Sequence, residues 1–155
     1  MSNICSLEEY LKLLLKQNLV LEYNIEDKKK SHIEYVSCNS KDIKTNTLFI
    51  CKGAHFREEF LKDAIISGAV CYISENKYEL GNDCSYIIVN DIRKAMAYIS
   101  NYFYNKAWEK LNLVGITGTK GKSTTTYFIR YIFDEYLKSI NEPMSSVISS
   151  IDTSD

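Results

Sequence analysis

The sequence predicts an α/β chain in which a small domain is followed by the first helix, strand, phosphate-binding loop and helix of a parallel-sheet domain. Two observations predict it. Short segments rich in β-branched and aromatic residues alternate with segments of helical periodicity. The stretch GITGTKGKSTTT, residues 115–126, stands between a strand pattern and a helix pattern, which is the setting that a phosphate-binding loop requires.

Composition excludes several classes of function. The chain has 155 residues, 45% of them hydrophobic, which is enough for a packed core. Its 19 Lys and Arg against 20 Asp and Glu leave a net charge of -1 without a basic stripe, so nucleic acid is not an expected partner. No segment approaches the roughly 18 apolar residues of a membrane span. The five cysteines form no C-x-x-C pair and are expected to be reduced, mostly buried thiols of a cytoplasmic protein.

The first half of the chain predicts a helix and four strands. Ser6 and Glu9 form a capping box ahead of a helix over Leu7–Lys16. The polar stretch EDKKKSH that follows is expected to be a solvated loop. The predicted strands are Ile33–Ser37, Thr47–Lys52, Ala69–Ser74 and Tyr86–Asn90.

A helical pattern between the second and third strands, over residues 56–68, predicts a βαβ unit with parallel strands. Asp91 is expected to cap a further helix that ends near Trp108. The aromatic cluster YFYNKAW lies at its end. Because no basic residues interleave with these rings, core and interface packing is favoured over base stacking.

The loop at residues 115–126 carries the chemistry. LNLVGIT is expected to be a strand and STTTYFIRYIFDEYL a helix. Gly118 and Gly121 allow backbone N–H groups to converge on anionic oxygens, and the helix N-terminus adds partial positive charge. Lys122 is placed to reach the β- and γ-phosphates, and the hydroxyl of Ser123 to ligate Mg²⁺.

The loop departs from the strict G-x-x-x-x-G-K-[ST] pattern, because Ile116 stands where the first glycine belongs and Gly115 comes one residue early. A glycine-rich turn without function is the alternative. Lys120 adds a second positive charge whose role stays open. Thr124 lies in the first helical turn, where its hydroxyl can bind phosphate or a free N–H group.

The stretch TGTKGKSTT resembles the ATP-binding loop of the Mur ligase family, T-G-T-N-G-K-[ST]-[ST], with Lys120 at the asparagine position. Upstream, CNSKDIKTNTLFICKGAHFREEFLKDAIISGAVCYISE is similar to the uridine-nucleotide domain of the same enzymes. The resemblance implies two domains: residues 1–90 would bind UDP-N-acetylmuramoyl-peptide, and residues 91–155 would begin the central ATP-binding domain.

The resemblance also implies the site residues. Those expected to bind ATP are Gly118, Thr119, Lys120, Gly121, Lys122, Ser123 and Thr124, with Lys122 catalytic and Ser123 the metal ligand. Those expected to contact the UDP-sugar-peptide are Cys38, Ser40, His55, Phe56 and Arg57. The sequence departs from the family pattern at Asn39, which replaces an aspartate, at Lys41, which replaces an arginine, and at Thr45-Asn46 and Arg57-Glu58. These departures affect the affinity of the uridine site more than its location.

Within the family, the likeness is to ligases that add L-lysine or meso-diaminopimelate to UDP-N-acetylmuramoyl-L-alanyl-D-glutamate in peptidoglycan synthesis, with ATP and Mg²⁺, through an acyl phosphate. The resemblance covers only the start of such an enzyme. We therefore expect the 155 residues to be inactive alone, to be less stable after about Asn90, and to take the missing ligase domains, as a separate chain, for a partner. Two alternatives remain: a stand-alone uridine-nucleotide-binding module, and an unrelated small phosphate-loop NTPase.

Overall fold

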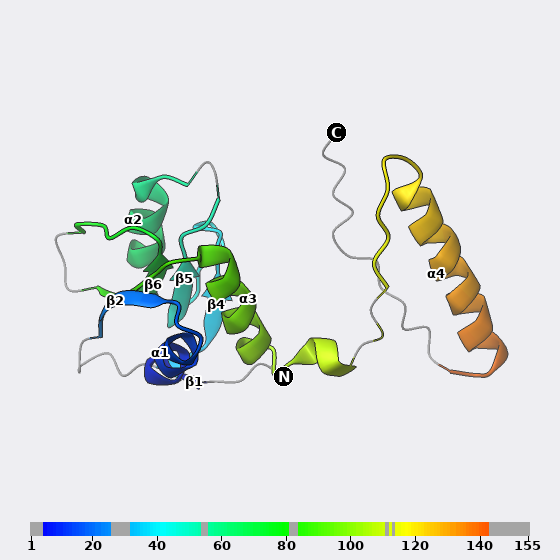
Figure 1. Ribbon diagram of the computed structural model, residues 1–155, viewed down its shortest axis with the longest axis horizontal. Helices are drawn as coiled ribbons and strands as arrows, with labels where there is room; N and C mark the ends of the chain where they lie inside the picture. The colour runs from blue at the N-terminus through cyan, green and yellow to red at the C-terminus, as the bar shows by residue number, and fades with distance from the viewer. Residues whose placement is uncertain are drawn as a thin grey trace. The chain divides into compact units, whose positions relative to one another are not determined.

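The computed structural model describes residues 5–25, 32–53, 56–80, 84–110, 112 and 114–142, with the backbone alone at Trp108 and Lys110. The chain divides into two compact units, Met1–Leu111 and Asn112–Asp155 (Figure 1). This division differs from the predicted boundary after residue 90. The helix after that residue buries Ile92, Ala95 and Ile99 in the core of the first unit, so the boundary falls later.

The first unit is built on a five-stranded mixed sheet with the order β2-β7-β6-β5-β4. The strands are β2 (Val20–Asn24), β4 (Tyr35–Ser37), β5 (Thr47–Ile50), β6 (Ala69–Ser74) and β7 (Ser85–Val89). Four of them run parallel, and β2 is antiparallel to β7 at the edge. The parallel β5-α2-β6 unit confirms the predicted βαβ crossover.

One short strand, β1 (Cys5–Ser6), and the edge strand β2 were not predicted. The expected strand over Ile33–Ser37 is divided at Glu34 into β3 (His32–Ile33) and β4. β3 pairs with β1 (Cys5–Ser6) in a separate two-stranded sheet, whereas β4 joins the main sheet. β2 contains the polar residues Glu22 and Asn24 and is mostly exposed, so it has the pattern of an edge strand without a clear apolar alternation.

The helices of the first unit follow the predictions closely. They are α1 (Leu7–Lys16), α2 (Glu58–Ile66), α3 (Ile92–Phe103) and a 3₁₀ turn, η2 (Ala107–Lys110). The capping box forms, because the Glu9 carboxylate accepts a hydrogen bond from the Ser6 backbone N–H at 2.8 Å. Asp91 caps α3 by accepting from the Lys94 backbone N–H at 2.9 Å. α3 ends earlier than predicted, at Phe103.

Helices cover both faces of the sheet, which gives the unit three layers (Figure 1). Alternate residues of one strand therefore enter different cores: Leu48 and Ile50 pack with α1 and α3, whereas Phe49 packs with α2. The same alternation places Ile73 on the first face and Tyr72 on the second. All five cysteines are free thiols, and four are buried, as predicted.

The second unit contains α4 (Lys122–Ser139), which confirms the helix predicted after the loop. The strand predicted over residues 111–117 is wrong for the part that the structure describes, since 112 and 114–117 have no strand pairing. A strand needs a neighbour to satisfy its backbone groups, and the sheet belongs to the first unit. The predicted element SSVISSIDTSD lies outside the described residues. Within the described ranges, no helix combines the length and apolarity needed to cross a bilayer.

Candidate functional site

The carboxyl ends of β4 and β5 carry most of the residues predicted to contact a uridine nucleotide. The two strands are parallel neighbours, with Ser37 paired to Phe49, so the loops that follow them emerge at the same edge of the sheet. Ligands of open α/β sheets bind at this edge. Cys38 and Ser40 follow β4, and Phe56 and Arg57 follow β5.

The loop after β4 is held in a tight turn by its own polar side chains. The Ser37 hydroxyl accepts the Asn39 N–H at 3.0 Å, and the Asn39 side-chain oxygen accepts the Lys41 N–H at 3.0 Å. The turn leaves Cys38 exposed and Ser40 half-buried. Asparagine and aspartate both carry the side-chain acceptor oxygen that this turn uses.

The loop after β5 carries the aromatic ring of Phe56 and the guanidinium of Arg57. Gly53 has φ +118, a conformation that L side chains rarely adopt, and its carbonyl accepts the Phe56 N–H at 3.1 Å. Phe56 is half-buried, whereas Arg57, at the N-cap of α2, is exposed. His55, predicted beside them, lies outside the described residues.

The Phe56 ring belongs to an aromatic cluster that sequence reasoning missed. Its centroid lies 6.4 Å from that of Phe49, 6.3 Å from that of Phe60 and 5.9 Å from that of Tyr78. Tyr78 follows the carboxyl end of β6, so the cluster joins the ends of two adjacent strands. The sequence signal for this cluster was the position of Tyr78, an aromatic residue four positions after the end of the buried strand β6.

The second predicted site, the glycine-rich loop, lies in the other unit. Gly118 has φ +151 and Gly121, the N-cap of α4, has φ +77, so both use conformations that favour glycine. The Lys122 ammonium donates to the Gly118 carbonyl at 2.8 Å, across the loop. Ser123 is half-buried in the first turn, and Thr119, Lys120 and Thr124 are exposed.

The donors of this loop fit a phosphate. A helix N-terminus, an ammonium group and the hydroxyls of Ser123 and Thr124 are gathered within one turn. An ideal Cβ at Gly121 would meet no atom within 4 Å, so the approach to the loop is open there. The Ser123 hydroxyl offers Mg²⁺ one hard oxygen ligand. Among the described residues, no group of three or more His, Cys, Asp or Glu side chains is arranged to hold a metal ion.

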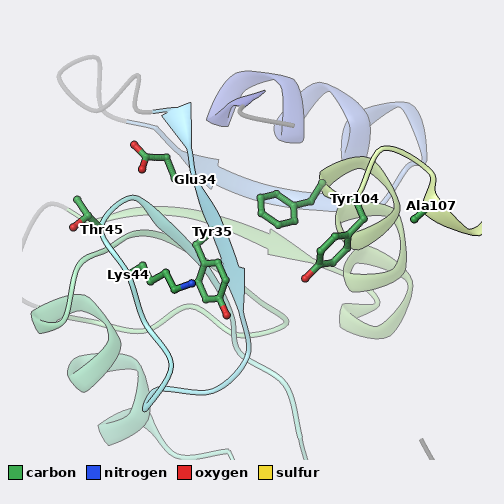
Figure 2. Close-up of a pocket in the computed structure, with 7 residues that line it drawn as sticks. Glu34, Tyr35, Lys44, Thr45, Tyr104 and Ala107 are labelled. Carbon is green, nitrogen blue, oxygen red and sulfur yellow. The ribbon is translucent and has the colours of Figure 1, made fainter. Parts of the chain in front are cut away.

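A third feature is a cavity of about 720 Å³ in the first unit, which contains none of the predicted site residues. It is lined by Glu34, Tyr35, Lys44, Thr45, Phe103, Tyr104 and Ala107. Figure 2 shows Lys44 reaching toward the ring of Tyr35, with Nζ 4.1 Å from the ring centroid. Tyr35 begins β4, so this cavity lies at the amino ends of the strands, opposite to the edge that carries Ser40 and Phe56.

A second, more open hollow of about 540 Å³ follows the glycine-rich loop along α4. Its lining residues are Thr124, Tyr127, Phe128 and Tyr131. The three aromatic side chains are 56–67% exposed, although they are large and apolar. An uncovered aromatic face of this size is typical of a surface that another segment covers.

Comparison with known proteins gives relatives that match most of the chain. The chain is 40% identical over 140 residues to the UDP-N-acetylmuramyl-tripeptide synthetase of Lactobacillus acidophilus, which covers 90% of this chain and 26% of the relative. It is 43% identical over 117 residues to the UDP-N-acetylmuramoyl-L-alanyl-D-glutamate–L-lysine ligase of Enterococcus faecalis, covering 76% of this chain and 23% of the relative. The chain thus spans about a quarter of the length of these relatives.

Among solved structures, a UDP-N-acetylmuramoylalanyl-D-glutamyl-2,6-diaminopimelate–D-alanyl-D-alanyl ligase from Acinetobacter baumannii matches with a TM-score of 0.57 and 18% identity. The match covers 88% of this chain and 29% of that chain. At this identity the match supports the fold alone. No family model matches the chain.

Proposed function

The chain belongs to the Mur ligase family, and from this premise we propose that it forms the N-terminal part of an ATP-dependent ligase of peptidoglycan precursor synthesis. The ligase would add a third amino acid, L-lysine or meso-diaminopimelate, to UDP-N-acetylmuramoyl-L-alanyl-D-glutamate. The observation that carries the proposal is one continuous likeness over 90% of the chain, which takes in both the sheet-edge loops and the glycine-rich loop.

The sheet edge of the first unit would bind the UDP-sugar-peptide. The half-buried Ser40 hydroxyl and the exposed Arg57 guanidinium are the groups suited to polar and anionic parts of a nucleotide, because a guanidinium matches phosphate geometry. The Phe56 ring offers an apolar surface to the base or ribose. We assign His55 and Cys38 to the same site from the family resemblance.

The glycine-rich loop would bind ATP. ATP with Mg²⁺ supplies the phosphoryl group that converts the peptide carboxylate into an acyl phosphate, from which the incoming amine displaces phosphate. Lys122 would leave the Gly118 carbonyl for the phosphates, where its charge offsets the charge that develops in transfer. Ser123 would ligate Mg²⁺, and the backbone from Gly118 to Thr124 would orient the phosphates.

We further propose that the 155 residues bind ligands without turning them over, in the cytoplasm. Positioning two reactants accounts for a large part of a ligase's rate acceleration, and the curated relatives are about four times as long. The remaining domains of such a ligase are the proposed partner. The exposed aromatic face of α4 is the surface we assign to that partner.

Calorimetry with ATP-Mg²⁺ and with UDP-N-acetylmuramoyl-L-alanyl-D-glutamate tests the proposal. Both ligands are expected to bind. Lys122→Ala should weaken the binding of ATP only, and Ser40→Ala should weaken the binding of the UDP-sugar-peptide only. Ser67→Ala, at the exposed end of α2, is the matched control for Ser40. Binding of the UDP-sugar-peptide alone would favour a uridine-nucleotide module, and binding of ATP alone would favour an unrelated phosphate-loop NTPase.

A further inference from the structure

Tyr72 is a buried residue whose hydroxyl contacts a loop at the candidate nucleotide site. It lies in β6 with 1% of its surface exposed, paired with Phe49 on one side and Tyr86 on the other. Its hydroxyl accepts the Tyr78 N–H at 3.2 Å and donates to the Tyr78 carbonyl at 3.4 Å. One buried side chain thus holds both backbone groups of a residue six positions later.

The segment that Tyr72 holds is fixed at two further residues. The Ser74 hydroxyl accepts the Asn76 N–H at 3.0 Å. The Lys77 ammonium donates to the Glu22 carboxylate of β2 at 2.5 Å, and this hydrogen bond raises the pKa of Lys77. Residues 76–78 are therefore attached to β6 and β2 one after another. Connecting loops are usually more mobile than the strands that they join, whereas this loop is held by hydrogen bonds at three successive residues.

The fixed segment places the Tyr78 ring against Phe56. Their centroids are 5.9 Å apart with an interplanar angle of 55°, and the Tyr72 ring lies 6.0 Å from the Tyr78 ring on the other side. Tyr78 thus stands between the strand residue and the predicted nucleotide contact. If Tyr78 shifted, Phe56 would lose one of its three aromatic neighbours.

Simple core packing does not require the Tyr72 hydroxyl. A phenylalanine would fill the same volume, and burying a hydroxyl costs free energy unless it is hydrogen-bonded. In this chain the hydroxyl is satisfied by the backbone of Tyr78. The role that distinguishes tyrosine from phenylalanine at residue 72 is therefore to fix the loop.

We propose that Tyr72 is a positioning residue for the nucleotide site, and that it acts through Tyr78 to hold the Phe56 ring in the orientation that receives the uridine moiety of the UDP-sugar-peptide. The inference rests on the proposed function. It adds the carboxyl end of β6 as a third side of a site whose other residues follow β4 and β5.

The test compares three variants of the full 155-residue chain. Tyr72→Phe removes the hydroxyl and keeps the ring, and Tyr78→Leu removes the ring that contacts Phe56. Tyr102→Phe is the matched control, because it removes a hydroxyl that donates to Glu9 on the opposite face of the sheet, away from the loop that carries Tyr78. Calorimetry measures the affinity for UDP-N-acetylmuramoyl-L-alanyl-D-glutamate, and aromatic NMR measures the ring resonances of Phe56.

Tyr72→Phe and Tyr78→Leu are expected to weaken binding about five- to twentyfold and to shift the Phe56 resonances, whereas Tyr102→Phe changes neither. ATP affinity should stay the same in all three. Unchanged binding and unchanged Phe56 resonances in Tyr72→Phe would overturn the inference. Failure of the unmodified chain to bind the UDP-sugar-peptide would instead overturn the proposed function, and the Phe56 resonances would then still report whether Tyr72 positions that ring.

Discussion

The ammonium of Lys122 donates a hydrogen bond of 2.8 Å to the carbonyl of Gly118, so the cation of the loop and the glycine at its opposite side are linked directly. Gly118 has φ +151, a conformation that L side chains rarely adopt. The two groups meet in the loop to which we assign phosphate binding. A phosphate offers the ammonium a charged acceptor, which forms a stronger hydrogen bond than a neutral carbonyl.

Removing the Lys122 ammonium should therefore reduce ATP affinity. A hydrogen bond to a charged group contributes about 1.5–3 kcal/mol, so Lys122→Ala is expected to weaken ATP binding roughly ten- to hundredfold in calorimetry. Lys120→Ala is the matched control, since it removes the same charge two residues earlier. A loss with Lys120→Ala as large as that with Lys122→Ala would mean that loop charge, and not the position of Lys122, determines affinity.

The unit boundary after Leu111 can be tested with two isoleucines. Ile99 of α3 is fully buried among residues of α1 and the sheet, so Ile99→Ala should destabilise the first unit by about 2–5 kcal/mol in denaturant unfolding. Ile132 of α4 is 64% exposed, and Ile132→Ala should leave that transition unchanged. An Ile99→Ala variant as stable as the unmodified chain would place α3 outside the first core.

The stability of α3 should depend on pH through Asp91. The hydrogen bond from the Lys94 N–H, with the Lys94 side chain as a second cause, lowers the pKa of Asp91. A carboxyl whose pKa is lowered by folding contributes stability above its unfolded pKa, and this contribution is lost as the pH falls through the folded value. At pH 7, Asp91→Ala should lower the denaturation midpoint. At acid pH, where the carboxylate of the unmodified chain is protonated, the midpoints of the variant and the unmodified chain should lie closer together.

Asp91→Asn separates the hydrogen bond from the charge. It keeps an acceptor oxygen for the Lys94 N–H, so it should retain much of the stability at pH 7 while losing the acid dependence contributed by residue 91. Asp63→Ala, at an exposed position in α2, is the control for loss of a carboxylate. Equal acid dependence in Asp91→Ala and the unmodified chain would contradict the assignment.

Hydrogen exchange should differ between the two units. None of the residues of α4, all within the described part of the chain, is buried, and most of the stability of a protein helix comes from tertiary packing. Its amides are expected to exchange much faster than those of β6, four of whose six residues, Cys71–Ser74, form a buried run. Protection of α4 equal to that of β6 in a monomer would show that α4 is covered.

The sequence by itself determined the elements whose signals are local. The capping residues Ser6 and Asp91 mark helices that the structure contains, and the apolar stripe between two strands predicts the βαβ crossover. The glycines of the loop predict its positive φ angles, because few other residues adopt them readily. Each of these sequence signals depends on residues that lie close together along the chain.

Only the tertiary structure decided which segments find a partner. β2 becomes a strand because β7 offers a free edge, whereas residues 114–117, with a stronger apolar pattern, have no strand partner among the described residues. The hydrogen bonds of Tyr72 to Tyr78, and the contact of Tyr78 with Phe56, likewise depend on neighbours brought together by the sheet. The backbone N–H and C=O groups of a strand need hydrogen bonds to another segment, and a local sequence pattern does not specify where that segment lies.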